Sequence, residues 1–264
     1  MREHKGAMFA IKAAAAVFLI MPLAVMFVYS LADRWISILP EGFTIQYYIS
    51  TLTNQAFLMG ILRGIVISAL PVLITNVSVL LALYVVIVYL PNMEKVVQIF
   101  CLIPTTINGI IVATSVLSMY AGSGTVFANR VVMLACIYCV FVLPVTYQGI
   151  RNSLYAVNTK GILEAAQMLG CRKFYSYVTV VIPSIFPGLA ASALMGFAGL
   201  FGDFAIIKIT ASSQYETAQA FLYRNRQADT QELSSAVIIL LLISLAINYA
   251  VHKSQNKQKE RREK

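Results

Sequence analysis

The sequence has 264 residues, of which 59% are hydrophobic and only 12% are charged, and its mean hydropathy is +0.77. Soluble domains carry roughly 25% charged residues, so this composition argues against a water-soluble enzyme, a disordered chain or a disulfide-built domain. The net charge of +9 in so apolar a chain favours a signal for membrane topology over nucleic-acid binding. The composition therefore predicts a membrane protein without a nucleic-acid partner.

Six stretches without Asp, Glu, Lys or Arg are long enough to cross a bilayer, which takes about 20 apolar residues. An Ala-Gly-Ser-Gly sequence at 121–124 ends the third stretch. The first stretch follows three basic residues, and its length favours a retained helix over a cleaved signal peptide. We predict an all-α membrane protein, one transmembrane domain over residues 1–264, with helices at about 13–32, 60–90, 96–120, 128–150, 176–202 and 233–252.

Six crossings that start in the cytoplasm place fourteen of the 20 Lys and Arg residues inside and six outside. Positive residues retard translocation of the loops that hold them. The asymmetry therefore predicts that both termini are cytoplasmic. Residues 253–264 then form a basic cytoplasmic tail that contacts anionic membrane lipid.

No catalytic or metal-binding constellation is evident in the sequence. The two histidines, His4 and His252, lie at opposite ends, and the chain has no P-loop sequence for binding nucleotide phosphates. The pair Cys136 and Cys139 lies in an apolar stretch without a second ligand pair, which indicates core cysteines. We expect no cofactor and no metal in this chain, and we expect any ATP to be held by another protein.

The connection between the fourth and fifth predicted helices contains a short amphipathic segment, Gly161 to Gly170. Apolar residues recur there at helical spacing, Glu164 is placed in the first turn, and Gly170 suits a left-handed helix stop. We therefore predict a cytoplasmic helix over about 159–170, with a stripe formed by Ile162, Ala165, Ala166 and Leu169. Its spacing fits a helix that docks on a partner and equally one that lies on lipid or on its own bundle.

The sequence Glu164-Ala165-Ala166, three residues, Gly170, nine residues, then Val180-x-Ile182-Pro183 resembles the EAA motif of binding-protein-dependent ABC importer permeases. The family pattern ends in Ile-x-Leu-Pro, so Val180 and Ile182 are conservative departures. The likeness extends to the six-helix layout, to Glu41-Gly-Phe-Thr44 and to Phe201-Gly-Asp-Phe-Ala205. The pattern looks most similar to the subgroup that serves spermidine/putrescine, ferric iron and phosphonates.

This resemblance implies the type I (MetI-like) permease architecture in a bacterial inner membrane. It implies that the helix near 159–170 docks into a cleft of an ATPase subunit, which holds ATP and Mg. The other implied partners are a second permease subunit, identical or different, and an extracytoplasmic binding protein. The residues to which it assigns coupling to the ATPase are Glu164, Ala165, Ala166, Leu169, Gly170 and Arg172; Arg172 also suits a solvated topology charge.

Two groups of polar residues are candidates for the solute pathway. Asp203, Lys208 and Arg63 lie near predicted helix ends, where they form either a mouth for the solute or ordinary interfacial charges. Neutral polar residues lie deeper and either line a water-filled path or bond between helices. The candidates that we select for the pathway are Asn76, Thr105, Thr106, Asn108 and Asp203.

The resulting hypothesis is a permease subunit that moves a small solute, of the polyamine, phosphonate or ferric-iron type, by alternating access. The alternative is an ion-coupled secondary transporter, which favours a carboxylate or histidine at mid-membrane. None of the six predicted helices places one at its centre. A membrane-embedded enzyme or scaffold is less favoured, because no catalytic set is found.

Overall fold

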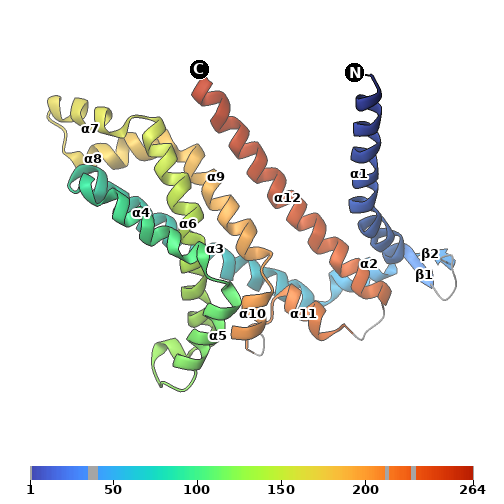
Figure 1. Cartoon of the computed structure of the whole chain (residues 1–264). Coiled ribbons are helices and arrows are strands. Elements are labelled where there is room, and N and C mark those ends of the chain that lie inside the picture. Colours follow the sequence, from blue (N-terminus) through green and yellow to red (C-terminus); the bar gives the residue numbers. More distant parts are fainter. Residues whose placement is uncertain (1, 35–40, 212–213, 227–229, 264) are drawn as a thin grey trace.

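The computed structural model describes residues 2–34, 41–211, 214–226 and 230–263, and for residues 2–11, 13, 16, 34, 41 and 254–263 it describes the backbone alone. The described chain is helical apart from one small antiparallel hairpin, in which Ala32 pairs with Phe43 and Arg34 with Glu41 (Figure 1). Its first half comprises α1 (Arg2–Leu31), β1 (Ala32–Arg34), β2 (Glu41–Phe43), α2 (Gln46–Thr53), α3 (Gln55–Val88), η1 (Pro91–Met93), α4 (Glu94–Leu102), η2 (Ile103–Thr106) and α5 (Gly109–Tyr120).

The second half is helical throughout its described residues. Its elements are η3 (Val126–Ala128), α6 (Arg130–Ala156), α7 (Thr159–Met168), α8 (Lys173–Ser176), the π-helix η4 (Tyr177–Val181), α9 (Ile182–Phe201), α10 (Ala205–Thr210), α11 (Ala218–Arg224) and α12 (Thr230–Glu263).

Within the described part of the chain, four helical segments are long and apolar enough to cross a membrane, and a fifth candidate is a bent pair. The four are Gln55–Val88, Arg130–Ala156, Lys173–Phe201 and Thr230–Lys253. The described apolar part of α1, Val17–Leu31, is shorter than a full crossing. The predicted helical membrane architecture is therefore confirmed apart from the hairpin, whereas six crossings and cytoplasmic termini stay predictions.

The predicted third helix, 96–120, is not one continuous helix. The chain turns by 93° between Pro91–Thr106 and Gly109–Tyr120. Pro104 has no N–H for a helical bond, so the chain tightens into η2. Ile107 and Asn108 are then extended, and the Asn108 side chain accepts from the Ile110 N–H at 2.9 Å, which starts α5 in a new direction.

Several helix ends differ from the predicted ones. α3 begins at Gln55, since the Asn54 side chain accepts from the N–H groups of Ala56 and Phe57. α6 continues to Ala156 and so includes Arg151, which lies just past the predicted helix end at residue 150. α12 continues to Glu263, so the basic segment 253–263 is helical in its backbone.

Among the described residues, three apolar clusters hold the bundle together. One lies toward the α5 and α10 end and includes Ile67, Tyr138 and Ile207. The second joins α3, α6, α7, η4 and α9, and the third joins α3, α11 and α12. Glycines allow α6 and α9 to cross closely, because a side chain at Gly149 would collide with Ser192 and one at Gly196 with Val142.

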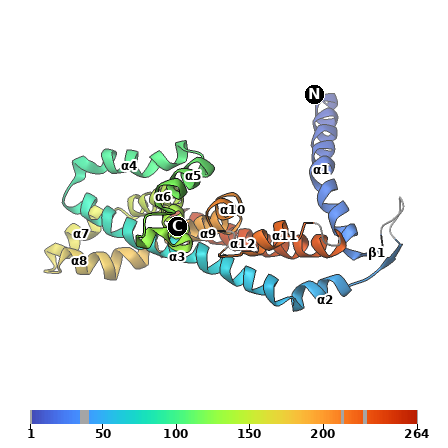
Figure 2. The ribbon, with the colours of Figure 1, turned by 90° about the horizontal axis from the view of Figure 1, so that it is seen from below.

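The two termini and α7 lie at the same end of the molecule (Figure 1). The loop between α5 and α6, together with α10 and α11, lies at the opposite end. α1 stands apart from the other helices for most of its length (Figure 2), and from Val17 to Phe27 it exposes a series of large apolar side chains. An even number of crossings follows from this arrangement if α1 and the bent pair each span the membrane.

Candidate functional site

The predicted cytoplasmic helix is present as α7, two residues shorter than expected at its C-terminal end. It ends in a Schellman motif: the Gly170 N–H donates to the Gln167 carbonyl at 2.9 Å and the Cys171 N–H to the Ala166 carbonyl at 3.0 Å. Gly170 has φ +81°, so the predicted left-handed stop is confirmed. Only glycine adopts this conformation without steric cost.

The predicted placement of Glu164 in the first turn is wrong. α7 begins at Thr159, which makes Glu164 its sixth residue and removes the helix-dipole argument. The predicted apolar stripe is also wrong in part, because Leu163 is the fully buried apolar side chain of this helix. Ala165 and Leu169 are exposed, and Ile162 and Ala166 are half-buried.

The outer face of α7 presents apolar and acidic side chains together. Met168 is 90% exposed and Leu169 is 84% exposed, although both are large and apolar. Glu164 is exposed as well, and Arg172 is exposed just beyond the helix. Two neighbouring apolar side chains that cover nothing in their own chain indicate a contact surface.

The inner face attaches α7 firmly to α6. The Thr159 hydroxyl donates to the Leu154 carbonyl at 2.7 Å, and both residues are buried. Leu163 packs in the same cluster as Ile150, Leu154 and Tyr177. α7 and the end of α6 are therefore joined by both a hydrogen bond and apolar packing.

The second half of the EAA-like motif lies where the π-helix η4 meets α9, with Val180 in η4 and Ile182 and Pro183 at the start of α9. The Ile182 N–H donates to the Tyr177 carbonyl, five residues back, directly before Pro183. Proline cannot donate a helical bond and its ring crowds the carbonyl four residues earlier, which a locally widened helix relieves. The Tyr177 hydroxyl, buried, donates to the Leu80 carbonyl at 3.0 Å and so ties this segment to α3.

The polar residues predicted to line a pathway fall into separate places. Thr105, Thr106 and Asn108 lie together at the bend between η2 and α5 and are exposed. Both threonine hydroxyls donate to carbonyls three residues earlier. Asn76 is buried in α3, where its amide nitrogen donates to the Val72 carbonyl at 2.7 Å and its side-chain oxygen has no partner among the described residues.

Asp203 lies directly after α9 and is bound within the chain. Its carboxylate accepts from the Tyr138 hydroxyl at 2.9 Å and from the Ile206 N–H at 3.3 Å, which joins α6 to the start of α10. Burial raises the pKa of the Asp203 carboxyl, and the hydrogen bond from Tyr138 and those from the backbone lower it in part. The predicted mouth formed by Asp203, Lys208 and Arg63 is therefore not one cluster of free charges.

The other two mouth residues have aromatic neighbours instead. The Lys208 ammonium lies 3.9 Å from the centre of the Tyr223 ring, and the Arg226 guanidinium lies 4.6 Å from the same ring. Arg63 lies 5.9 Å from the ring of Tyr215, whose hydroxyl donates to the Arg63 carbonyl. These cations are held at the end of the molecule opposite α7.

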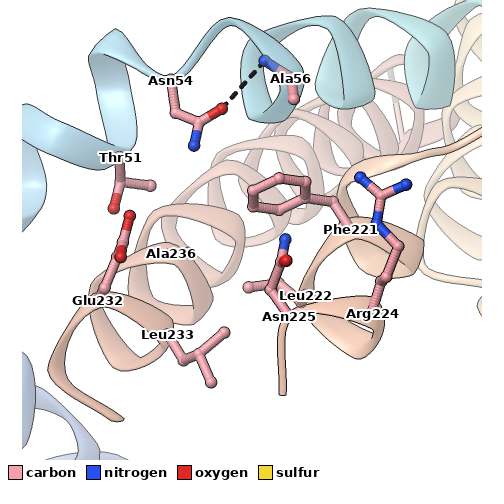
Figure 3. A pocket seen from close by; sticks show the side chains of 10 residues that line it. All are labelled: Thr51, Asn54, Ala56, Phe221, Leu222, Arg224, Asn225, Glu232, Leu233 and Ala236. Atoms are coloured by element: carbon pink, nitrogen blue, oxygen red, sulfur yellow. Dashed lines mark hydrogen bonds between the residues drawn. The ribbon is translucent and has the colours of Figure 1, made fainter. Parts of the chain in front are cut away.

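A cavity of about 270 Å³ lies at that same opposite end, between α2, α3, α11 and the start of α12 (Figure 3). Phe221 from α11, the Asn54 side chain and Glu232 border it. None of the residues that we predicted for the pathway lines it. The cavity is therefore separate from the bend and from α7.

Sequence analysis missed the contacts that connect these parts. Tyr138 and Glu94 are single polar residues in or beside apolar stretches, and no local pattern indicates their distant partners. Tyr138 lies in an apolar stretch, four residues before Val142. From the sequence alone it could equally be an aromatic side chain that faces lipid.

Comparison with known families decides the class of protein. Residues 64–261 match the family described as "Binding-protein-dependent transport system inner membrane component". The chain belongs to this family. It is an inner-membrane permease component of an ABC importer, as the EAA-like sequence predicted, and the family match covers α7 and the bend.

Among its relatives is the putative 2-aminoethylphosphonate transport system permease protein PhnV of Salmonella typhi, 22% identical over 233 residues, which cover 86% of this chain and 87% of PhnV. The molybdenum transport system permease protein ModB of Haemophilus influenzae is 28% identical over 127 residues, 45% of this chain and 55% of ModB. These two relatives are named for phosphonate and molybdenum transport. They lend no support to the predicted polyamine or ferric-iron solute.

Solved structures show the same fold. A bacterial alginate ABC transporter, in complex with an alginate-bound periplasmic protein, has a chain that matches with a TM-score of 0.67 at 21% identity, covering 97% of this chain and 96% of that one. The MetNI methionine ABC transporter matches with a TM-score of 0.56 at 16% identity, covering 76% of this chain and 97% of that one. Both likenesses support the predicted MetI-like architecture.

Proposed function

We propose that this permease moves its solute by alternating access and is driven by a separate ATPase subunit that docks on α7. The ATPase holds ATP and Mg, and an extracytoplasmic binding protein delivers the solute. A second permease subunit, identical or different, completes the pathway. The end of the molecule that carries α7 and both termini is cytoplasmic.

The exposed face of α7 is the observation that carries this proposal. Met168 and Leu169 are the apolar part of the face, and Glu164 contributes one charge. Small side chains at Ala165 and Ala166 permit close approach of a partner surface. The rigid link from α7 to α6 through Thr159 and Leu163 provides a means of passing a movement into the membrane.

The bend between η2 and α5 supports placing the solute pathway beside it. Non-helical backbone at membrane depth is tolerated only where it is buried in protein or lines a water-filled cavity. Transporters bind solutes at such interrupted helices. We therefore assign Thr105, Thr106 and Asn108 to the pathway, with the Asn108 amide nitrogen free to donate because its oxygen caps α5.

The solute is a small polar anion, with a phosphonate as the first candidate. The cations at the end opposite α7 support an anion, since Lys208 and Arg226 flank one ring there. The pKa of the Tyr223 phenol is lowered, first by its hydrogen bond with Lys208 and then by the positive charges of Arg226 and Lys208. A polyamine would meet electrostatic repulsion at this entrance.

An ion-coupled secondary transporter has no such supporting observation. Among the described residues, the carboxylate of Asp203 lies past the end of α9 and is occupied by Tyr138 and the backbone. A coupling carboxylate at mid-membrane is what that mechanism favours.

Affinity purification of the tagged chain from its native membrane, followed by mass spectrometry, tests the proposal. We expect a P-loop ATPase in the eluate, and we expect Glu164→Lys and Gly170→Leu to lose it while the chain still inserts. Asn92→Lys, an exposed change in η1 rather than α7, is the matched control and should retain it. Proton- or sodium-driven uptake without any ATPase would overturn the proposal.

A further inference from the structure

Three polar side chains join the start of α4 to the end of α6. Arg151 donates from Nε and Nη2 to one Glu94 carboxylate oxygen, at 2.9 and 2.6 Å. The Tyr155 hydroxyl donates to the other carboxylate oxygen at 2.5 Å. The Arg151 guanidinium also lies 4.9 Å from the centre of the Tyr155 ring. We call Glu94, Arg151 and Tyr155 the α4–α6 clamp.

The clamp differs from an ordinary surface ion pair in its geometry. Both oxygens of the Glu94 carboxylate accept hydrogen bonds, and the two charged side chains keep only 29% and 23% of their surface exposed. An exposed pair contributes about 0–1 kcal/mol, but charge-assisted bonds with reduced access to water hold their geometry more strongly. The three residues therefore fix one helix end against the other.

The position of the clamp sets what it connects. On the α6 side, Tyr155 precedes Thr159, the first residue of α7, by four positions. On the α4 side, Glu94 is the first residue of the helix that leads through η2 to the 93° bend. α7, which carries the exposed docking face, and the bend with its pathway residues are thus joined through one side-chain cluster.

The remaining attachment of α4 is weak. No side chain of α4 is fully buried, although Val97 and Cys101 pack partly against the apolar cluster around α7. A helix held by so little apolar packing follows its polar attachments when its neighbour moves.

We propose that Glu94, Arg151 and Tyr155 are positioning residues that transmit the movement of α7 to the bend at Thr105, Thr106 and Asn108, so that the clamp couples ATP hydrolysis to opening of the pathway. This inference rests on the proposed function, because it needs an ATPase that moves α7. The clamp contacts neither the solute nor the nucleotide. Its loss separates transport from hydrolysis while the transporter stays assembled.

The test uses the complete transporter, purified and reconstituted in proteoliposomes with its binding protein, and measures solute transported per ATP hydrolysed. We expect Glu94→Gln and Arg151→Glu to retain the ATPase and to hydrolyse ATP, but to lower that ratio by about five-fold or more, the lower range of coupling between sites. The double variant Glu94→Arg with Arg151→Glu restores the pair with reversed charges and should recover the ratio. Tyr155→Phe, the milder change, should lower it less.

The control is the ion pair at the end of the molecule opposite α7, where Arg224 lies 2.9 Å from Glu216. Glu216→Gln removes a salt bridge that has no connection to α7, so its ratio should equal that of the wild type. An unchanged ratio in Glu94→Gln would overturn the clamp. The clamp would also be overturned if the charge-reversed double variant failed to restore the ratio and its melting temperature fell as much as that of the single variants. A wild-type chain that recovers no ATPase would instead contradict the proposed function.

Discussion

Thr159, the first residue of α7, donates its hydroxyl to the carbonyl of Leu154 in the last turn of α6. The bond spans the turn between the two helices, in which Asn158 has φ +51°, and it holds the start of α7 against the end of α6. We predict that Thr159→Val, which keeps the shape but removes the hydroxyl, lowers the free energy of unfolding by about 1 kcal/mol. Thr159→Ser retains the donor and is the control; thermal unfolding in detergent measures both, and equal losses would contradict the role of the bond.

Gly170 is needed at the end of α7 for its backbone conformation, and not because a larger side chain would collide with its neighbours. No atom lies within 4 Å of a Cβ built there, yet its φ is +81°. Gly170→Ala should therefore cost roughly 1–2 kcal/mol and weaken recovery of the ATPase. Gly122→Ala is the matched control, because its surroundings are equally open and its φ is not positive. Equal effects of the two substitutions on unfolding would refute the conformational argument.

Asn108 and Asn129 provide a matched pair for testing the pathway. Each caps a helix through its side-chain oxygen, with the N–H of Ile110 at 2.9 Å and that of Val131 at 3.0 Å. Replacement of either by Ala should lower stability by about 0.5–2 kcal/mol. Only Asn108→Ala should also change the apparent KM for solute uptake, since only Asn108 lies at the bend. A KM shift of the same size in both would remove Asn108 from the pathway.

Asp203 gives a prediction with a pH dependence. Burial raises the pKa of its carboxyl in the folded chain, so the folded form binds a proton more tightly than the unfolded form. The contribution of this group to stability is therefore fully present below the ordinary pKa of an aspartate and is lost as pH rises through the raised pKa of the folded chain. Asp203→Asn keeps an acceptor for Tyr138 and should flatten this dependence at pH values above the ordinary aspartate pKa of about 3.9.

Asp203→Ala removes that acceptor altogether. It leaves the Tyr138 hydroxyl without its partner and should cost about 1–3 kcal/mol at any pH. Melting temperatures measured across the pH range for wild type, Asp203→Asn and Asp203→Ala separate the two effects. A wild-type curve that runs parallel to that of Asp203→Asn would contradict the raised pKa.

The sequence predicted the parts of this structure that depend on local pattern. The long apolar stretches located the main helices, and Gly170 located the end of α7, because hydrophobic length and left-handed conformation are encoded within a few residues. The family assignment followed from the spacing of Glu164, Gly170 and Pro183. These features need no knowledge of tertiary contacts.

The bend at Ile107 and Asn108 was not predictable from absence of charge, since an apolar stretch gives no direction to its helix. Leu163 takes the buried position because packing against α6 and η4 selects the buried face of α7, and periodicity within the segment does not show which face that is. The Glu94–Arg151 pair joins positions 57 residues apart, and the Tyr138–Asp203 pair joins positions 65 apart. Only the folded chain brings such residues together.

The most direct measurement of the central claim is site-specific photo-crosslinking from α7 in the native membrane. A photoreactive phenylalanine analogue replaces Met168, which is 90% exposed on α7, or Met119, which is 70% exposed on α5. We predict a crosslinked product containing a P-loop ATPase from position 168 and none from position 119. Crosslinks from position 168 to lipid alone, or to the ATPase from both positions equally, would contradict docking on α7.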